Sequence, residues 1–165
     1  MTHMQCDLEH TGTPQAHVRD LMTPAPLAIS PSTSVDEAYR LMQGQRIGHL
    51  PVCEDGRLVG LISERDLRLV LPSPATSLAA HELHYLLERL TVAEIMTRFP
   101  VTIGPDHLVT EAASRMLSHK VHALPVTENR RLVGIRTRTH LLYAFIRSQA
   151  AQSLAACDRN ALQDW

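Results

Sequence analysis

The feature that most constrains this sequence is an internal repeat. When the chain is shifted by 74 residues, so that Val18 lies over Val92, two long stretches match without an insertion. The matched segments include Met22-Thr23 with Met96-Thr97, Leu50-Pro51-Val52 with Leu124-Pro125-Val126, and Arg57-Leu58-Val59-Gly60 with Arg131-Leu132-Val133-Gly134. Self-similarity at one fixed offset indicates two copies of one structural unit. We therefore expect a flexible N-terminal segment at 1–16, repeat 1 at 17–71, a connector at 72–91, repeat 2 at 92–149 and a tail at 150–165.

Each repeat is predicted to fold in the order β-α-β-β-α. Ser34 and Glu37 have the spacing of a helix capping box, and an amphipathic apolar stripe follows them. The residues Glu54-Asp55-Gly56 provide a turn between two apolar runs, which predicts a hairpin. The elements expected are strands at 27–29, 50–53 and 58–62 with helices from 35 and 64, and in repeat 2 strands at 101–103, 123–127 and 132–136 with helices at 109–119 and from 137. One such unit leaves an apolar sheet face exposed. The predicted fold class is therefore α/β (α+β), with two repeats packed around a pseudo-twofold axis.

The connector is predicted to contain a helix of its own. Between Ser77 and Thr91, apolar residues fall at helical spacing on one face: Leu83, Leu86, Leu87 and Leu90. Such a helix could pack on its own repeats or on a second chain, and both alternatives remain open.

Composition excludes several classes of partner. The formal net charge is −1, so the chain has no basic excess for binding a phosphate backbone, and we expect no nucleic-acid partner. No apolar run approaches the ~20 residues of a membrane span, and the polar N-terminus is unlike a signal peptide. The three cysteines lie far apart and form no CxxC pair, which fits a reducing, cytoplasmic compartment.

Two motifs occur in order in the chain and identify a family. Met-Thr-x-x-Pro precedes the first strand of each repeat, at Met22 to Pro26 and at Met96 to Pro100. The strand sequence His49-Leu50-Pro51-Val52 is followed by Gly60-Leu61-Ile62-Ser63-Glu64-Arg65-Asp66. Together these motifs resemble the CBS (cystathionine β-synthase) domain over residues 17–147. The connector from His81 to Met96 also resembles that of bacterial stand-alone CBS pairs of the acetoin-utilisation type.

The resemblance implies a regulatory module with two clefts between its repeats. Members of the family commonly bind AMP, ADP, ATP, S-adenosylmethionine or NAD there, and CBS pairs commonly associate as homodimers. The chain is therefore expected to be a signal-transducing ligand sensor that needs no cofactor. Its expected partners are an adenine nucleotide, with AMP preferred, a second copy of itself and an unidentified effector protein. The alternative is an interaction or scaffold module that binds no small ligand.

The segment from Gly60 to Asp66 carries the chemistry of the predicted site. The Ser63 hydroxyl can reach a phosphate at a helix start, and Arg65 adds a fixed positive charge. Asp66 is an acceptor-only carboxylate, which suits the two vicinal hydroxyls of a ribose. A competing interpretation is that Ser63 and Asp66 only cap the helix. Arg65 has no part in capping, and it favours the ligand interpretation.

The resemblance implies that the other repeat supplies the adenine side of the same site. Carried over to this sequence, the positions are Thr97, Pro100, Val101 and the backbone near His122 and Ala123. His49, His122 and Lys120 stand near the places where the family contacts phosphate. For each histidine, a purely structural or solvent-facing role remains open.

Repeat 2 departs from the motif. His140 stands where Asp66 stands in repeat 1, and a neutral imidazole cannot accept hydrogen bonds from two hydroxyls. Arg136 also replaces the apolar Ile62. The sequence therefore predicts one competent cleft and one impaired cleft.

No metal site or catalytic centre is predicted. The histidines and cysteines that lie near one another in sequence lack the tight pairing of four zinc ligands. These groups are His3, Cys6 and His10, the pair His81 and His84, and the pair His119 and His122. No Ser-His-Asp or Cys-His arrangement and no phosphate-binding glycine fingerprint can be assembled, so we expect no enzymatic activity.

Overall fold

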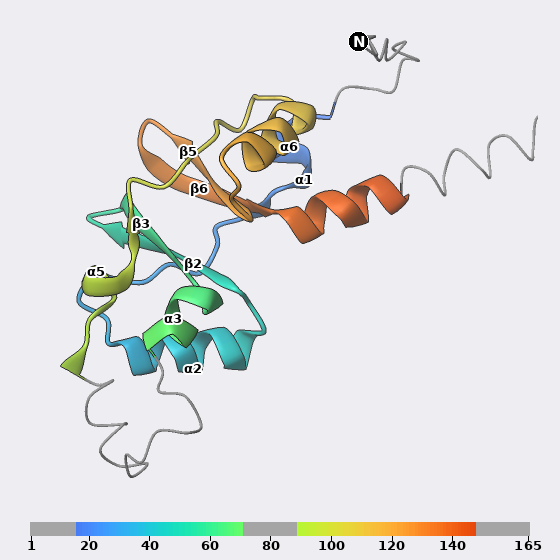
Figure 1. Cartoon of the computed structure of the whole chain (residues 1–165). Coiled ribbons are helices and arrows are strands. Elements are labelled where there is room, and N and C mark those ends of the chain that lie inside the picture. Colours follow the sequence, from blue (N-terminus) through green and yellow to red (C-terminus); the bar gives the residue numbers. More distant parts are fainter. Residues whose placement is uncertain (1–15, 71–88, 148–165) are drawn as a thin grey trace, which may run out of the picture.

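The computed structural model describes residues 16–70 and 89–147 (Figure 1). The predicted N-terminal segment, connector helix and C-terminal tail lie outside the described residues, except for Ala16 and residues 89–91.

The predicted helix, hairpin and second helix are present in both repeats. Repeat 1 contains α2 (Val35–Gln45), β2 (His49–Glu54), β3 (Arg57–Ser63) and α3 (Glu64–Val70). Repeat 2 contains α6 (Val109–Ser118), β5 (Ala123–Glu128), β6 (Arg131–Thr137) and a helix over 138–147. In the first hairpin, Asp55 and Gly56 both have positive φ, of 50° and 73°. This is the backbone that a two-residue turn with the twist of its strands requires.

The predicted amphipathic stripe packs α2 on its hairpin. Val35, Ala38 and Met42 are buried in one cluster with Leu50 and Ile62 of the two strands. At the start of the helix, the Ser34 hydroxyl accepts a hydrogen bond from the Glu37 backbone N–H (3.2 Å). The capping residue and the apolar face therefore fix both the start and the orientation of α2.

The predicted first strands, 27–29 and 101–103, are each reduced to a single bridge. Ile29 bridges Val52 in parallel, and Ile103 bridges Val126 in the same way. Prolines surround both segments: Pro24, Pro26 and Pro31 in repeat 1, and Pro100 and Pro105 in repeat 2. Because proline has no backbone N–H, these segments cannot extend a hydrogen-bonded ladder.

The two repeats exchange their first segments, which the sequence did not predict. Helix α1 (Val18–Leu21) precedes repeat 1, but Val18 is buried in the apolar cluster of repeat 2. Conversely, α5 (Val92–Ile95) precedes repeat 2, and Val92 is buried in the cluster of repeat 1. The backbone fixes both crossings, because Val18 N–H donates to the His107 carbonyl (2.8 Å) and Val92 N–H donates to the Thr33 carbonyl (2.8 Å). Each apolar core is therefore completed by residues of the other repeat.

Short strands join the two hairpins into one six-stranded sheet. After α1, β1 (Thr23–Pro24) pairs with β6, and after α5, β4 (Thr97–Arg98) pairs with β3. The hairpins also meet directly where Arg57 pairs with Arg131. In Figure 1, α2 and α3 lie beside the first hairpin, and α1 and α6 lie beside the second, at the opposite end of the molecule.

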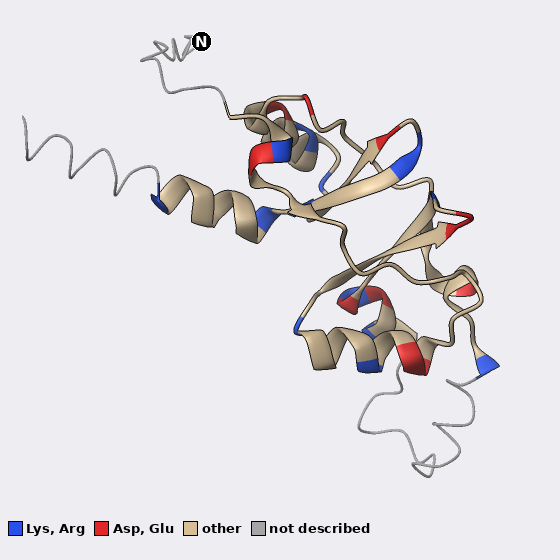
Figure 2. Ribbon diagram, turned by 180° about the vertical axis from the view of Figure 1, so that it is seen from behind, with Lys and Arg blue, Asp and Glu red and all other residues tan. Residues whose placement is uncertain are grey.

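Charged residues of both signs are distributed over the described surface (Figure 2). They lie mainly on helices and hairpin tips, and the blue and red segments alternate instead of forming one basic face. Several form local pairs, including Arg68 with Glu64 on α3 (2.6 Å) and Arg115 with Glu111 on α6 (2.8 Å). Among the described helices, none is long and apolar enough to cross a bilayer.

Candidate functional site

The Ser63–Asp66 segment forms a reciprocal cap at the start of α3. The Asp66 carboxylate accepts hydrogen bonds from the Ser63 backbone N–H (2.8 Å) and hydroxyl (2.6 Å) through the same oxygen, Oδ2. The Ser63 hydroxyl oxygen lies 3.3 Å from the Asp66 backbone N–H, which donates to it. The capping role that the sequence suggested is therefore present, and Oδ1 is the carboxylate oxygen that these bonds leave out.

A cleft of about 450 Å³ lies directly beside this cap. That volume falls within the ~300–1,000 Å³ range of small-molecule pockets. The structure brings to it every site residue that the sequence predicted except Asp66, namely His49, Ser63, Arg65, Thr97, Pro100, Val101, Lys120, His122 and Ala123. The cleft also contains residues that sequence reasoning missed: Gly48, Leu61, Glu64, Phe99 and Val121.

The pairing of β4 with β3 explains why both repeats line one cleft. Leu61 and Gly60 of β3 pair with Thr97 and Arg98 of β4. This pairing holds the first segment of repeat 2 against the strand that leads to Ser63, and residues of both segments line the cleft. Gly60 permits this close approach, because a Cβ atom there would lie 2.3 Å from Met96 Sδ and 3.3 Å from the Thr97 carbonyl oxygen. The second wall is the turn between α6 and β5, where Lys120 adopts a left-handed backbone with φ of 54°.

Basic and apolar residues both line the cleft. Arg65, Lys120, His49 and His122 are the basic residues that line it. Glu64 is the acidic group in the lining set, and its charge is paired with Arg68. The apolar lining residues are Leu61, Phe99, Pro100, Val101, Val121 and Ala123. This combination suits a molecule that carries both an apolar group and negative charge.

The surroundings of His49 in the cleft shift its pKa. Burial lowers its pKa below the usual value for histidine, and the nearby imidazole of His122 lowers it further. The Asp66 carboxylate acts in the opposite direction and raises the pKa. His49 is therefore neutral at pH 7, and an anion beside it would favour its protonated form.

The equivalent positions in repeat 2 are arranged differently. Arg136 is only 3% exposed, and its Nη2 donates to the His140 carbonyl (3.1 Å). Its buried Nε has no hydrogen-bond partner among the described residues. Burial and the charge of Arg136 both lower the pKa of His140. Thr137 accepts only a long hydrogen bond from the His140 backbone N–H (3.4 Å), and no carboxylate stands at this helix start. A buried cation thus replaces the apolar residue, and a neutral imidazole replaces the acid.

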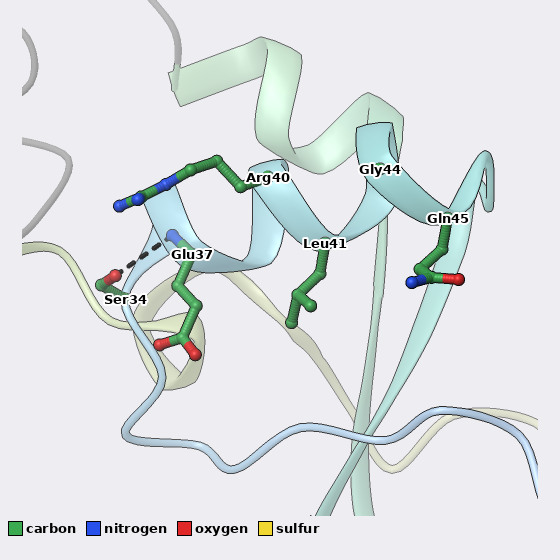
Figure 3. Close-up of a pocket in the computed structure, with 6 residues that line it drawn as sticks. All are labelled: Ser34, Glu37, Arg40, Leu41, Gly44 and Gln45. Atoms are coloured by element: carbon green, nitrogen blue, oxygen red, sulfur yellow. Dashed lines mark hydrogen bonds between the residues drawn. The ribbon is translucent and has the colours of Figure 1, made fainter.

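A second hollow lies on the outer face of α2 (Figure 3). It measures about 560 Å³, and its lining residues come from a single helix and its cap: Ser34, Glu37, Arg40, Leu41, Gly44 and Gln45. In Figure 3, Glu37, Leu41 and Gln45 point to the same side of α2 without meeting, and Arg40 points away from them. A ligand there would contact only one element and would remain largely solvated, so we place the functional site in the cleft between the repeats.

The described residues contain no group of three or more His, Cys, Asp or Glu side chains arranged to hold a metal ion. His119 and His122 are described, whereas the other histidine groups considered from the sequence lie outside residues 16–70 and 89–147.

Comparison with known proteins assigns the family. The CBS-domain family model matches residues 18–73 and 92–147. The chain belongs to the CBS-domain family. A CBS domain-containing protein of Dictyostelium discoideum is 36% identical over 132 residues, covering 79% of this chain and 91% of that protein. An inosine-5'-monophosphate dehydrogenase of Korarchaeum cryptofilum is 34% identical over 129 residues, but these are 76% of this CBS pair and only 22% of the enzyme.

Solved CBS-pair structures share the fold. One, described as an acetoin utilization protein (AcuB) of Vibrio cholerae, superposes with a TM-score of 0.69 and 27% identity, covering 84% of this chain and 96% of that one. A CBS pair in complex with 5'-methylthioadenosine and S-adenosyl-L-methionine superposes with a TM-score of 0.69 and 27% identity. The match covers 82% of this chain and 99% of that one. An Arabidopsis thaliana CBS pair in complex with AMP superposes with a TM-score of 0.66 and 31% identity. The match covers 81% of this chain and 98% of that one. The family and fold predicted from the sequence are confirmed.

Proposed function

We propose that this CBS pair is a regulatory module that binds an adenosyl ligand, with AMP as the preferred candidate, and that it has no catalytic role. The observation that carries the proposal is the shared cleft, in which Ser63 and Arg65 of repeat 1 face Thr97, Pro100 and Val101 of repeat 2. Two CBS pairs of the same fold support it, since one is in complex with AMP and the other with 5'-methylthioadenosine and S-adenosyl-L-methionine.

The basic and the apolar residues of the cleft suit the phosphate and the base of a nucleotide, respectively. The phosphate would lie near Arg65, Lys120 and the imidazoles of His49 and His122, where charge-assisted hydrogen bonds are available. The base would lie against the apolar residues, which include Pro100 and Val101. The ribose hydroxyls would bond to Asp66, either through Oδ1 or after Oδ2 releases the Ser63 hydroxyl.

A ligand in this position could transmit a signal because it contacts both repeats at once. If the two repeats have more than one relative tilt, the ligand favours the tilt in which both sets of contacts form. We propose that a second copy of the chain and an effector protein respond to this change. In this account, the repeat 2 cleft, with Arg136 and His140, does not bind the same ligand.

A thermal-shift experiment with AMP, ADP, ATP, S-adenosylmethionine and NAD tests the proposed function. A ligand that binds only the native state adds about 2.7 kcal/mol to stability at a hundredfold excess over Kd. At least one of the five should therefore raise Tm, with AMP producing an increase. If none raises Tm at millimolar concentration, the nucleotide-sensing proposal is wrong.

That negative result would favour the alternative function of a ligand-free scaffold. The observation behind this alternative is the helix over 138–147, where Leu142, Tyr143, Phe145 and Ile146 are all largely exposed. In Figure 1 this helix projects away from the rest of the described structure. Exposed apolar groups of this size are typical of protein–protein contact surfaces.

A further inference from the structure

Phe99 is the most unusual residue of the cleft. Its side chain is 89% exposed, although the chain has only two phenylalanines and 4% aromatic residues in total. Its backbone has a φ of 51°, a left-handed conformation that is strained for a bulky residue. Exposure of a large apolar ring costs free energy in the unliganded molecule. Such exposure at a residue that lines a cleft suggests that a bound molecule covers this ring.

The position of Phe99 is fixed from both sides. It follows β4, whose Thr97 and Arg98 are paired with β3, and it precedes Pro100, which restricts the backbone further. The strand that holds it, β3, is the one that ends at Ser63. Phe99 therefore follows a strand held by the same element that leads to Ser63, and both residues line the cleft.

The other repeat lacks this aromatic group. Ala25 occupies the equivalent position, after β1 and before Pro26, and it has the same left-handed backbone with a φ of 42°. The local backbone is therefore common to both repeats, and the ring is specific to the cleft that has Ser63, Arg65 and Asp66.

We propose that Phe99 is a further base-binding residue of the cleft, because its ring closes over the base of the ligand and stacks on it. The inference rests on the proposed function and adds a residue and a contact to it. The ligand class it defines is one with a flat aromatic base joined to an anionic end. An aromatic ring and a base attract each other through stacked π faces, which an aliphatic side chain of similar size reproduces only in part.

The test compares Phe99→Ala and Phe99→Leu with the unmodified protein by calorimetric titration with AMP. Loss of a stacked base typically weakens binding between about 5- and 100-fold, and we expect Phe99→Ala to fall in this range. The AMP affinity of Phe99→Leu should lie between those of the unmodified protein and Phe99→Ala, because leucine keeps the apolar contact but has no π face. In NMR spectra, the adenine protons of AMP should shift upfield on binding to the unmodified protein and much less on binding to Phe99→Leu.

Two controls separate stacking from a structural role. Ribose 5-phosphate has no base, so its affinity should be the same for Phe99→Ala and the unmodified protein. Leu27→Ala removes another exposed apolar side chain outside the cleft lining and should leave AMP affinity unchanged.

Three results would overturn the inference. Phe99→Ala could bind AMP as tightly as the unmodified protein, with or without loss of a dimer in light scattering, in which case the ring does not contact the base. It could instead weaken ribose 5-phosphate and AMP equally, which would show a structural effect. If the unmodified protein binds no adenine nucleotide at all, the proposed function fails and this inference fails with it.

Discussion

At the scale of single residues, Asp66 has two roles to reconcile. Its Oδ2 caps α3 through Ser63, and we also assign the carboxylate to the ribose. The two roles are compatible because a carboxylate has two oxygens and about four acceptor positions. The same cap occurs without a ligand role at Thr91, where Glu94 accepts from the Thr91 backbone N–H (2.7 Å) and hydroxyl (2.8 Å).

Asp66→Ala is therefore expected to weaken AMP binding by at least about tenfold, because it removes one or two charge-assisted hydrogen bonds of roughly 1.5–3 kcal/mol each. Loss of the cap should cost only ~1 kcal/mol of folding stability. Calorimetric titration and urea unfolding measure the two quantities. Glu94→Ala is the matched control, since it removes a similar cap outside the cleft lining and should leave affinity unchanged. Normal AMP binding by Asp66→Ala would assign the ribose contact to another group.

His49 makes folding stability depend on pH. Burial lowers its pKa in the folded protein, whereas in the unfolded chain the pKa is about 6.5. Between these two values the unfolded chain binds more protons, so stability is complete above about pH 7 and decreases as pH falls through 6.5. We expect Tm of the unliganded protein to fall between pH 7.5 and 5.5, and to fall less in His49→Gln. His119→Gln, at the exposed end of α6, should show the same fall in Tm as the unmodified protein. If Tm fell equally in His49→Gln, the pH dependence would not come from His49.

Most of the cleft could be predicted from sequence because the motifs recur twice in a fixed order. His49, Ser63 and Arg65 could be placed by the hairpin and the helix start, both of which are local structures. Phe99 was missed because a Phe between Arg98 and Pro100 has no periodicity of its own. The available signal was its mismatch with Ala25 in the aligned repeats.

At the scale of elements, the antiparallel pairing of β4 with β3 positions the cleft. The long helices and hairpins were predicted because their signals are local: the apolar stripe of α2, the turn at Asp55 and the cap at Ser63. Helices α1 and α5 and strands β1 and β4 were not predicted, since each spans only two to four residues. Such short segments are stabilised by contacts with the other repeat, which no local pattern reveals.

Gly60→Ala tests whether the close approach of β4 to β3 requires a residue without a side chain. A Cβ atom at this position would lie 2.3 Å from Met96 Sδ, so β4 or the Met96 side chain must move. We expect a loss of about 1–3 kcal/mol in the free energy of unfolding, measured by urea denaturation, together with weaker AMP binding.

Gly44→Ala is the matched control for this change. Gly44 lies in α2, and a Cβ atom added there would have no neighbouring atom within 4 Å, so alanine should stabilise the helix by roughly 0.5–1 kcal/mol. If Gly60→Ala were as stable as the unmodified protein, the close approach of β4 would not depend on glycine.

At the scale of the whole molecule, the exchange of first segments makes the two repeats one folding unit. Val18 completes the core of repeat 2 and Val92 completes the core of repeat 1, so neither repeat can bury its apolar face alone. The duplication seen in the sequence is thus explained by packing. The exchange also explains why one cleft can draw its walls from both repeats.

The exposed apolar surfaces lead us to expect a homodimer. Leu69 of α3, Leu117 of α6 and four residues of the helix over 138–147 are largely exposed in a single chain. Light scattering at tens of micromolar should give twice the 18.4 kDa mass of the chain. A mass equal to that of one chain at this concentration would show that these surfaces do not join two copies.

The central claim is that one cleft, lined by Ser63, Arg65 and the segment from Thr97 to Val101, binds an adenine nucleotide, whereas the cleft with Arg136 and His140 does not. Calorimetric titration of the unmodified protein with AMP tests this most directly, because it gives affinity and stoichiometry together. The account predicts saturable binding of one AMP per chain. Two equivalent nucleotides per chain, or no heat of binding with AMP at millimolar concentration, would contradict it.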